Sequence, residues 1–160
     1  MKQLILILII VLLFSACQGI YNRNKDITFD DIPIMGFETV EQIMQFVDAH
    51  VTFHSDEIHD TNEYWQSPDQ TYIWGRGDCE DFCILAMYFV YQELGLEPFL
   101  VSGYSELDIC GHGWVEVKGE WWEPQGGIRC DSYQDYYIDI YKISYAEVIY
   151  RSTHSHKTLR

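Results

Sequence analysis

Residues 77–95, "GDCEDFCILAMYFVYQELG", decide the fold of this chain. Apolar residues occupy most faces of this run, so the sequence predicts a helix that is buried in the middle of a domain. Asp78 and Asp81 have the spacing of a capping box at its start, and Gly95 is a suitable C-terminal cap. The helix is therefore expected to begin immediately at the residue that follows Asp78.

Two shorter helices are predicted upstream of this central helix. Thr39 is a suitable cap for a helix over residues 40–53, which has an apolar stripe at helical spacing. Ser67 and Pro68 are typical of a second helix start, and Gly75 ends that helix. Helices therefore fill the first half of the expected domain.

Downstream of the central helix the hydrophobic period changes to two, which is typical of strands. A tight turn at Lys118-Gly119 joins two of these strands into a hairpin. The predicted strands cover residues 99–104, 112–117 and 121–125, and residues 136–150 are predicted to form another half-buried strand or two. Helices followed by antiparallel strands predict an α+β fold.

The N-terminus has the pattern of an export signal. An apolar run over residues 4–14 precedes Ser15-Ala16-Cys17, and "LFSAC" resembles a bacterial lipoprotein lipobox, in which the cysteine is lipidated. An uncleaved anchor helix is the alternative. With either reading we expect a chain exported to the cell envelope, tethered to a membrane and facing the periplasm or the exterior.

The expected organisation has one domain. We assign residues 1–16 to the signal peptide, 17–37 to a lipid-anchored linker, 38–150 to the folded domain and 151–160 to a flexible tail. The formal net charge of −15 argues against nucleic acid and anionic lipid surfaces as partners. We expect a monomer whose membrane contact is the N-terminal lipid.

Cys79 lies in the first turn of the central helix, where free backbone N–H groups and the helix dipole stabilise a thiolate. A thiolate is the nucleophile of acyl-transfer chemistry. The neighbouring carboxylates of Asp78, Glu80 and Asp81 act in the opposite direction, because negative charge raises a thiol pKa. A cation is needed, and His112, between two glycines at a strand start, is the best candidate. The alternative for His112 is a surface residue at a strand end.

A third group should orient the imidazole. With a two-residue turn in the hairpin, Gln125 lies opposite His112 and Glu123 is its diagonal neighbour on the same face. A carboxylate would support an imidazolium more strongly, whereas an amide would still fix the tautomer. The residues themselves leave both candidates open.

The runs "GDCEDFCILAMYFVYQELG" and "GHGWVEVKGEWWEPQ", with Tyr64-Trp65 upstream, resemble the transglutaminase-like superfamily, in particular its bacterial transglutaminase-like cysteine proteinases. The resemblance covers about residues 60–126. It implies a papain-like core, in which the central helix packs on an antiparallel sheet, and a Cys-His-Asp triad. Cys79 would be the nucleophile and His112 the base. Glu123, before Pro124, stands where the family has aspartate before proline.

The function that the resemblance implies is a thiol hydrolase, a cysteine peptidase or amidase that acts on a protein or peptide through a thioester acyl-enzyme. Acyl transfer to an amine, as in transglutaminase cross-linking, is one alternative. A binding lipoprotein of the same fold without catalysis is another.

The resemblance requires no cofactor, but some of these proteinases bind calcium through the acidic residues beside the cysteine. Asp78, Glu80 and Asp81 match that cluster. The competing interpretation is that Asp78 and Asp81 only cap the helix. For the oxyanion, the backbone N–H of Cys79 is one expected donor. The indoles of Trp65 and Trp74 are candidates for another, although aromatic residues of this kind more often pack in a core.

The remaining cysteines leave two further hypotheses open. Cys79, Cys83, Cys110 and His112 supply four soft ligands, the number that zinc takes, although Cys83 is expected to face the core. Cys110 and Cys130 fall just past the hairpin ends and are predicted either to form a disulfide or to be two buried thiols.

Overall fold

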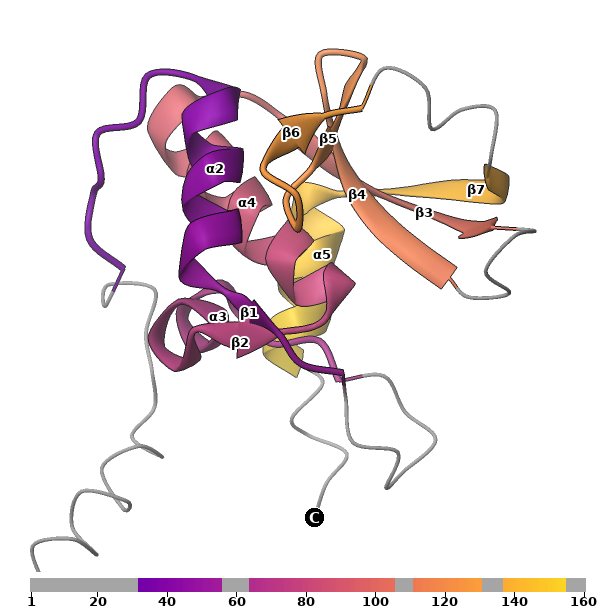
Figure 1. Cartoon of the computed structure of the whole chain (residues 1–160), viewed down its shortest axis with the longest axis horizontal. Helices are drawn as coiled ribbons and strands as arrows, with labels where there is room; N and C mark the ends of the chain where they lie inside the picture. The colour runs from indigo at the N-terminus through magenta and orange to yellow at the C-terminus, as the bar shows by residue number, and fades with distance from the viewer. Residues whose placement is uncertain (1–31, 56–63, 106–110, 131–136, 155–160) are drawn as a thin grey trace, which may run out of the picture. The chain divides into compact units, whose positions relative to one another are not determined.

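The computed structural model describes residues 32–55, 64–105, 111–130 and 137–154 (Figure 1). The predictions for the signal sequence, for Cys17 and for Cys110 lie outside these residues. In chain order the elements are α2 (Val40–His50), β1 (Thr52–Phe53), α3 (Pro68–Trp74), β2 (Arg76–Gly77), α4 (Cys79–Leu94), β3 (Pro98–Ser105), β4 (Gly111–Val117), β5 (Glu120–Glu123), β6 (Ile128–Arg129), β7 (Tyr137–Ser144) and α5 (Tyr145–His154). Within the described ranges, no helix combines the length and the apolar character that a membrane span requires.

Helix α4 is the centre of the fold, as predicted. It contacts α2, α3 and α5 as well as β2, β3 and β4, and Figure 1 shows it between α2 and the strands. Its buried residues cover most of its circumference: Asp81, Phe82, Cys83, Ile84, Leu85, Ala86, Met87, Phe89 and Val90. A helix with so few exposed faces is stable only where other elements surround it.

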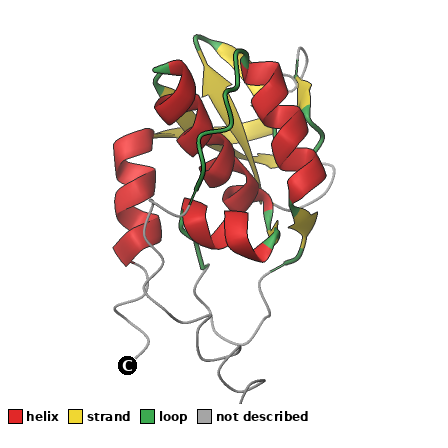
Figure 2. Ribbon diagram, turned by 90° about the vertical axis from the view of Figure 1, so that its left-hand side faces the viewer, coloured by secondary structure: helices red, strands yellow, loops and turns green. Residues whose placement is uncertain are grey.

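The strands form a five-stranded antiparallel sheet in the order β6-β5-β4-β3-β7. In Figure 2 the helices lie in front of this sheet. A separate parallel pair, β1 with β2, joins the end of α2 to the segment before α4, and this pair was not predicted. The α+β prediction is therefore confirmed, with a short parallel ribbon added beside the start of α4.

The helix caps lie where the sequence placed them. Thr39 forms a capping box with Gln42 at the start of α2, and Asp78 forms one with Asp81 at the start of α4. Gly95 ends α4 in the left-handed conformation, with φ of 63°. Helix α2 ends at His50, earlier than predicted, because the chain is extended at the next residue and leads into β1.

The hairpin of β4 and β5 has the predicted two-residue turn. Val117 lies opposite Glu120, and both turn residues have positive φ, 53° at Lys118 and 82° at Gly119, as a type I′ turn requires. Strand β5 ends at Glu123, where the chain turns with a hydrogen bond from Gly126 N–H to the Glu123 carbonyl. The predicted strand over 121–125 was therefore too long.

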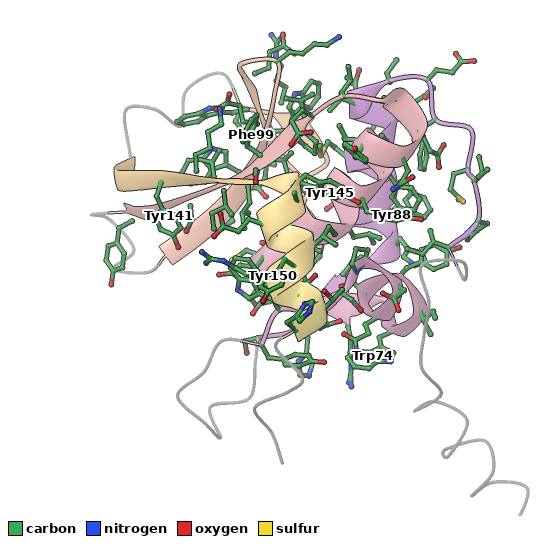
Figure 3. The ribbon with its side chains drawn as sticks, turned by 180° about the vertical axis from the view of Figure 1, so that it is seen from behind. Trp74, Tyr88, Phe99, Tyr141, Tyr145 and Tyr150 are labelled. Atoms are coloured by element: carbon green, nitrogen blue, oxygen red, sulfur yellow. The ribbon has the colours of Figure 1, made fainter. Side chains whose placement is uncertain are left out.

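The C-terminal segment corrects two predictions. Residues 137–144 form strand β7, but the chain from Tyr145 onward is helix α5, on which Figure 3 shows Tyr145 and Tyr150. The buried residues Tyr145, Val148 and Ser152 have the three- and four-residue spacing of a helix, which the alternating tyrosines obscured. Residues 151–154, which we assigned to the tail, belong to this helix.

The segment before α2 packs on the domain, although we expected a linker there. Ile32 is only 6% exposed and belongs to the core. The Glu93 carboxylate, near the end of α4, accepts hydrogen bonds from Met35 N–H at 2.9 Å and Phe37 N–H at 2.7 Å. Residues 32–37 therefore form a strap that is fixed to the C-terminal end of α4.

Candidate active site

Cys79 is the first residue of α4, and the chain on either side of it holds it there. Asp78 caps the helix in an extended conformation. A Cβ at Gly77 would lie 2.5 Å from Asp81 Cβ and 2.6 Å from Asp81 Oδ2, so only glycine lets β2 approach the first turn this closely. The position of the thiol is therefore set by the start of a buried helix rather than by a loop.

Asp81 is a structural residue of this helix start. It is fully buried, and its two oxygens accept backbone hydrogen bonds from Gln66 N–H at 2.8 Å and Asp78 N–H at 3.3 Å. A buried carboxylate with such partners is stable only while they stay in place. Asp81 therefore ties the segment before α3 to the residues around Cys79.

His112 and Glu123 form a close pair on β4 and β5. The distance from His112 Nε2 to Glu123 Oε2 is 2.5 Å, and Glu123 is only 6% exposed. Because an ionised carboxylate only accepts, Nε2 is the donor in this bond and Nδ1 remains for another partner. Glu123 Oε1 also accepts from Gln125 N–H at 3.1 Å, so Gln125 contributes through its main chain and holds the carboxylate.

The pKa of His112 is raised above its usual value by this environment. Burial alone would lower the pKa, but the hydrogen bond and the charge of Glu123, together with the charge of Glu80, outweigh burial. The raised pKa makes the neutral imidazole a stronger base, which suits a group that is proposed to take up a proton.

The start of β4 also contacts the thiol. Gly113, the residue after His112, donates a backbone hydrogen bond to the Cys79 sulfur, and this bond favours the thiolate. Gly113 faces α4, since a Cβ there would lie 3.8 Å from the Cys83 sulfur. The main chain beside His112 is thus in direct contact with the first turn of α4.

Glu80 is the unexpected partner of the nucleophile. The Cys79 thiol donates a hydrogen bond to Glu80 Oε2 at 3.0 Å. Burial, then the charge and the hydrogen bond of Glu80, and finally the charge of Asp78 raise the pKa of the thiol well above its usual value. The contact with Glu80 and the raised pKa therefore both favour the thiol form of Cys79 over the thiolate.

Sequence reasoning identified Glu80 as a repulsive charge and as a possible calcium ligand, and it missed both the bond of Glu80 to the thiol and the contact of Gly113. The position of Glu80 next to Cys79 was a usable signal for direct contact. Gly113 carried no such signal, because its contribution is a backbone N–H that depends on how β4 meets α4.

The three carboxylates near Cys79 do not fit a calcium site as they are arranged. Both oxygens of Asp81 accept backbone N–H groups, Glu80 accepts the thiol, and Asp78 caps the helix. Calcium takes six to eight oxygen ligands. Over the described ranges no three acidic, histidine or cysteine side chains are grouped as a metal site. The zinc hypothesis includes Cys110, which lies outside those ranges, and stays a prediction. Cys83 lies fully buried in the core.

The two candidate tryptophans lie in different settings. Trp65 packs partly buried against the core, with the Arg151 guanidinium carbon 5.7 Å from its ring centroid. Trp74, at the end of α3, is 37% exposed (Figure 3). An oxyanion role for either indole stays a prediction.

Comparison with known proteins finds this fold in LapG of Legionella pneumophila. One LapG structure aligns with a TM-score of 0.54 and 18% identity over 75% of this chain and 74% of LapG. An EGTA-treated form gives 0.50 and 20% identity, over 64% of this chain and 59% of LapG. The calcium-bound form aligns with a TM-score of 0.49 and 18% identity, over 64% of this chain and 60% of LapG. A candidate cysteine protease from Cytophaga hutchinsonii aligns with a TM-score of 0.43 and 16% identity, over 66% of this chain and 34% of that protein.

No protein-family profile matches the chain, and no curated protein sequence resembles it at a significant level. At these identities the two alignments with TM-scores of 0.50 or more bear on the fold alone. The chain has an α+β fold that it shares with LapG. In two of the LapG comparisons it spans about three fifths of that protein's length.

Proposed function

We propose that this protein is a thiol hydrolase, a cysteine peptidase or amidase, with Cys79 as nucleophile, His112 as general base and Glu123 as the residue that orients it. The observation that carries the proposal is the 2.5 Å bond between His112 and Glu123, at a strand start whose next residue contacts the Cys79 sulfur. The resemblance of residues 77–82 to transglutaminase-like cysteine proteinases supports the same assignment.

In the proposed reaction His112 Nδ1 takes the proton of the Cys79 thiol, and the sulfur attacks the substrate carbonyl carbon. The oxygen of the tetrahedral intermediate lies near the first turn of α4, where the Cys79 N–H has no acceptor within the helix. The intermediate collapses to a thioester, and the leaving amine takes the proton from His112. His112 then deprotonates water, which attacks the thioester and releases the carboxylic acid and the thiol.

Glu123 keeps Nε2 protonated throughout this cycle, so that Nδ1 is the nitrogen that exchanges the proton. Glu80 has to release the thiol before the first step, because its carboxylate holds the same proton. The raised pKa of His112 assists this transfer, since it makes the imidazole a stronger competitor for the proton.

The test is thiol reactivity together with substrate turnover. We expect electrophilic peptides to label Cys79 in the full chain at about pH 7 faster than they label a free thiol, because a bound substrate is proposed to release the thiol from Glu80. Cys79→Ala should lose peptide hydrolysis, whereas Glu38→Gln, a change at an exposed residue before α2, should retain it. Two results together would exclude the hydrolase: Cys79 reacts no faster than a free thiol, and the Cys79→Ala variant keeps its activity.

A binding protein of this fold without catalysis is the second candidate, and the contact of Cys79 with Glu80 favours it. A thiol whose pKa is raised and which is bonded to a carboxylate is a poor nucleophile. The same labelling experiment decides between the two candidates. Acyl transfer uses the same residues, with an amine in place of water, and amine incorporation into product would identify it.

We propose further that the chain is exported and is held at a membrane by lipid on Cys17, with the site facing the periplasm or the exterior. The apolar run of residues 4–14 and the sequence "LFSAC" support this location. Metabolic labelling with an alkyne fatty acid should mark the wild-type protein, and Cys17→Ala should remove the label and release the protein from the membrane fraction. A label that survives in Cys17→Ala contradicts the lipid anchor.

A further inference from the structure

The short strand β2 has an unused edge immediately before the nucleophile. On its other edge, Thr52 N–H donates to the Gly75 carbonyl at 2.9 Å and His54 N–H donates to the Gly77 carbonyl at 2.8 Å. In a strand the N–H and C=O of one residue point to one edge, and those of the next residue point to the opposite edge. Because Gly75 and Gly77 face β1, the N–H and C=O of Arg76 face away from it.

The main chain of Arg76 makes no hydrogen bond to any other residue that the structure describes. A donor and an acceptor on one extended residue match the main chain of a peptide that lies alongside as a further strand. Arg76 itself is exposed. Among the described residues, nothing pairs with this edge of the strand.

The position of this edge suits a substrate. Arg76 precedes Cys79 by three residues, which is about 10 Å of extended chain. A peptide that pairs with Arg76 in an extended form would bring a carbonyl two or three residues further along to the start of α4. The distance along the peptide from the residue that pairs with Arg76 to the scissile bond would then match the distance from Arg76 to Cys79.

The guanidinium of Arg76 adds a charge to this edge. Among the described cations, Arg129, Lys142 and Arg151 form ion pairs with glutamates. Arg76 has no ion pair in that part of the chain, although the protein carries a net charge of −15. An unpaired guanidinium beside a free main-chain edge is suited to a carboxylate on the docked peptide.

We propose that the substrate is an extended peptide that pairs with the main chain of Arg76 and carries an acidic side chain next to the pairing residue. This inference rests on the proposed hydrolase and narrows its substrate. It favours an unfolded protein segment over a small amide, which has too little main chain to pair.

The probe for the test is acetyl-Glu-Val-Gly vinyl sulfone, with a Gln-Val-Gly analogue that lacks the charge. The Cys79 sulfur adds to the terminal vinyl carbon, and a proton adds to the neighbouring carbon, so no group leaves. N-methyl versions of each residue of the probe remove one main-chain donor at a time. The second-order labelling rate of the full chain is measured for each probe, with iodoacetamide as a reagent that has no peptide chain.

We expect N-methylation at one position to slow labelling by about fivefold, the effect of one lost hydrogen bond, and the other positions to have little effect. The Glu probe should label about threefold faster than the Gln probe, as an exposed ion pair allows. Arg76→Ala should abolish that difference between the probes while preserving the N-methyl effect. Arg76→Pro, which removes the N–H, should slow both peptide probes by a larger factor than it slows iodoacetamide.

Lys118→Ala is the matched control, because it removes one exposed positive charge in the hairpin turn, about 20 Å of strand from His112. It should behave as the wild type. N-methyl probes that all react within twofold of the parent overturn the pairing, and this result does not depend on whether Arg76→Pro folds. Equal rates for the Glu and Gln probes overturn the acidic preference.

If the proposed hydrolase function itself is wrong, the labelling experiment gives a different result. Cys79 would then react with neither iodoacetamide nor the vinyl sulfones. The pairing would then be read from the Cys79→Ala protein, by fluorescence anisotropy of labelled acetyl-Glu-Val-Gly amide. Weaker binding of one N-methyl amide would support docking at Arg76 without catalysis, and equal binding of all of them would overturn it.

Discussion

The contact between Glu80 and the Cys79 thiol makes a direct prediction for the variant Glu80→Gln. The change removes the negative charge but keeps the length of the side chain and one acceptor oxygen. Because the charge and the hydrogen bond of Glu80 both raise the pKa of the thiol, that pKa should fall in the variant. The thiolate should therefore form at lower pH.

The size of the effect follows from the distance. Two unit charges separated by the 3.0 Å of this contact repel by about 1.4 kcal/mol in water and by about 5.5 kcal/mol at an effective dielectric constant of about 20. The lower figure is the appropriate one, since the Glu80 side chain can turn away from a thiolate. It corresponds to a fall of about one pKa unit.

The change in rate is smaller than the change in thiolate fraction. At a pH below the thiol pKa of both the wild type and Glu80→Gln, the thiolate fraction of Cys79 should be about tenfold higher in the variant. A less basic thiolate is also a weaker nucleophile, by about threefold per pKa unit. Iodoacetamide should therefore label Cys79 about threefold faster in Glu80→Gln at about pH 7.

The assay is the labelling rate of Cys79 as a function of pH, followed by mass spectrometry in EDTA. Glu38→Gln is the matched control, because Glu38 is an exposed glutamate that precedes α2. Its profile should coincide with that of the wild type. A labelling midpoint in Glu80→Gln that is unchanged or higher refutes the reasoning, as does an equal shift in Glu38→Gln.

Three further predictions concern the groups around the site. Glu123→Gln should lower the pKa of His112, measured by NMR. As the pH rises above the ordinary histidine pKa of about 6.5, the wild type should lose more unfolding free energy than the variant, because a raised histidine pKa stabilises the fold only until the pH rises through it. Gly77→Ala should destabilise the protein by about 2 kcal/mol in chemical denaturation, owing to the clash with Asp81, whereas Gly111→Ala, with open space around its Cβ, should not. Asp81→Ala should cost about 3 kcal/mol, since two backbone N–H groups lose their acceptor.

Each of these predictions has an outcome that contradicts it. A His112 pKa that stays the same or rises in Glu123→Gln would show that Glu123 does not set it. Equal stability of Gly77→Ala and Gly111→Ala would show that β2 can move away from α4. An Asp81→Ala protein as stable as the wild type would mean that water replaces the carboxylate.

Local signals predicted most of the fold. The capping pair of Asp78 and Asp81, the terminal Gly95 and the turn at Lys118-Gly119 each act within a few residues, so the sequence displays them directly. Helix α5 was misread because the alternation of tyrosine and aliphatic residues in the preceding strand β7 was extended into it, and only the burial of every third or fourth residue distinguishes helix from strand there. The strap of residues 32–37 depends on a glutamate far along the chain, which no local pattern reveals.

For the candidate site, the sequence indicated that His112 and Glu123 lie on one face of a hairpin, but it did not show the main-chain contacts around Cys79. The choice between Glu123 and Gln125 turned on where β5 ends, and an extrapolated ladder could not show that the chain turns after Glu123. The bond of Gly113 to the sulfur and the free edge of Arg76 are main-chain features. Side-chain identity carries little information about such groups, so they become visible only once strands and helices are placed in space.

The attachment of the strap to Glu93 has a mechanical consequence. Glu93 follows Cys79 by 14 positions on one helix, which corresponds to about 21 Å along its axis. A pull on the chain from the direction of its N-terminus is therefore borne first by the two hydrogen bonds of the Glu93 carboxylate and by Ile32 in the core. Force from the N-terminus would therefore separate the strap from the C-terminal end of α4 before it acted on the capping box at Cys79. In a chain attached to a membrane by its N-terminus, as proposed, the position of the Cys79 thiol would then be insensitive to that force.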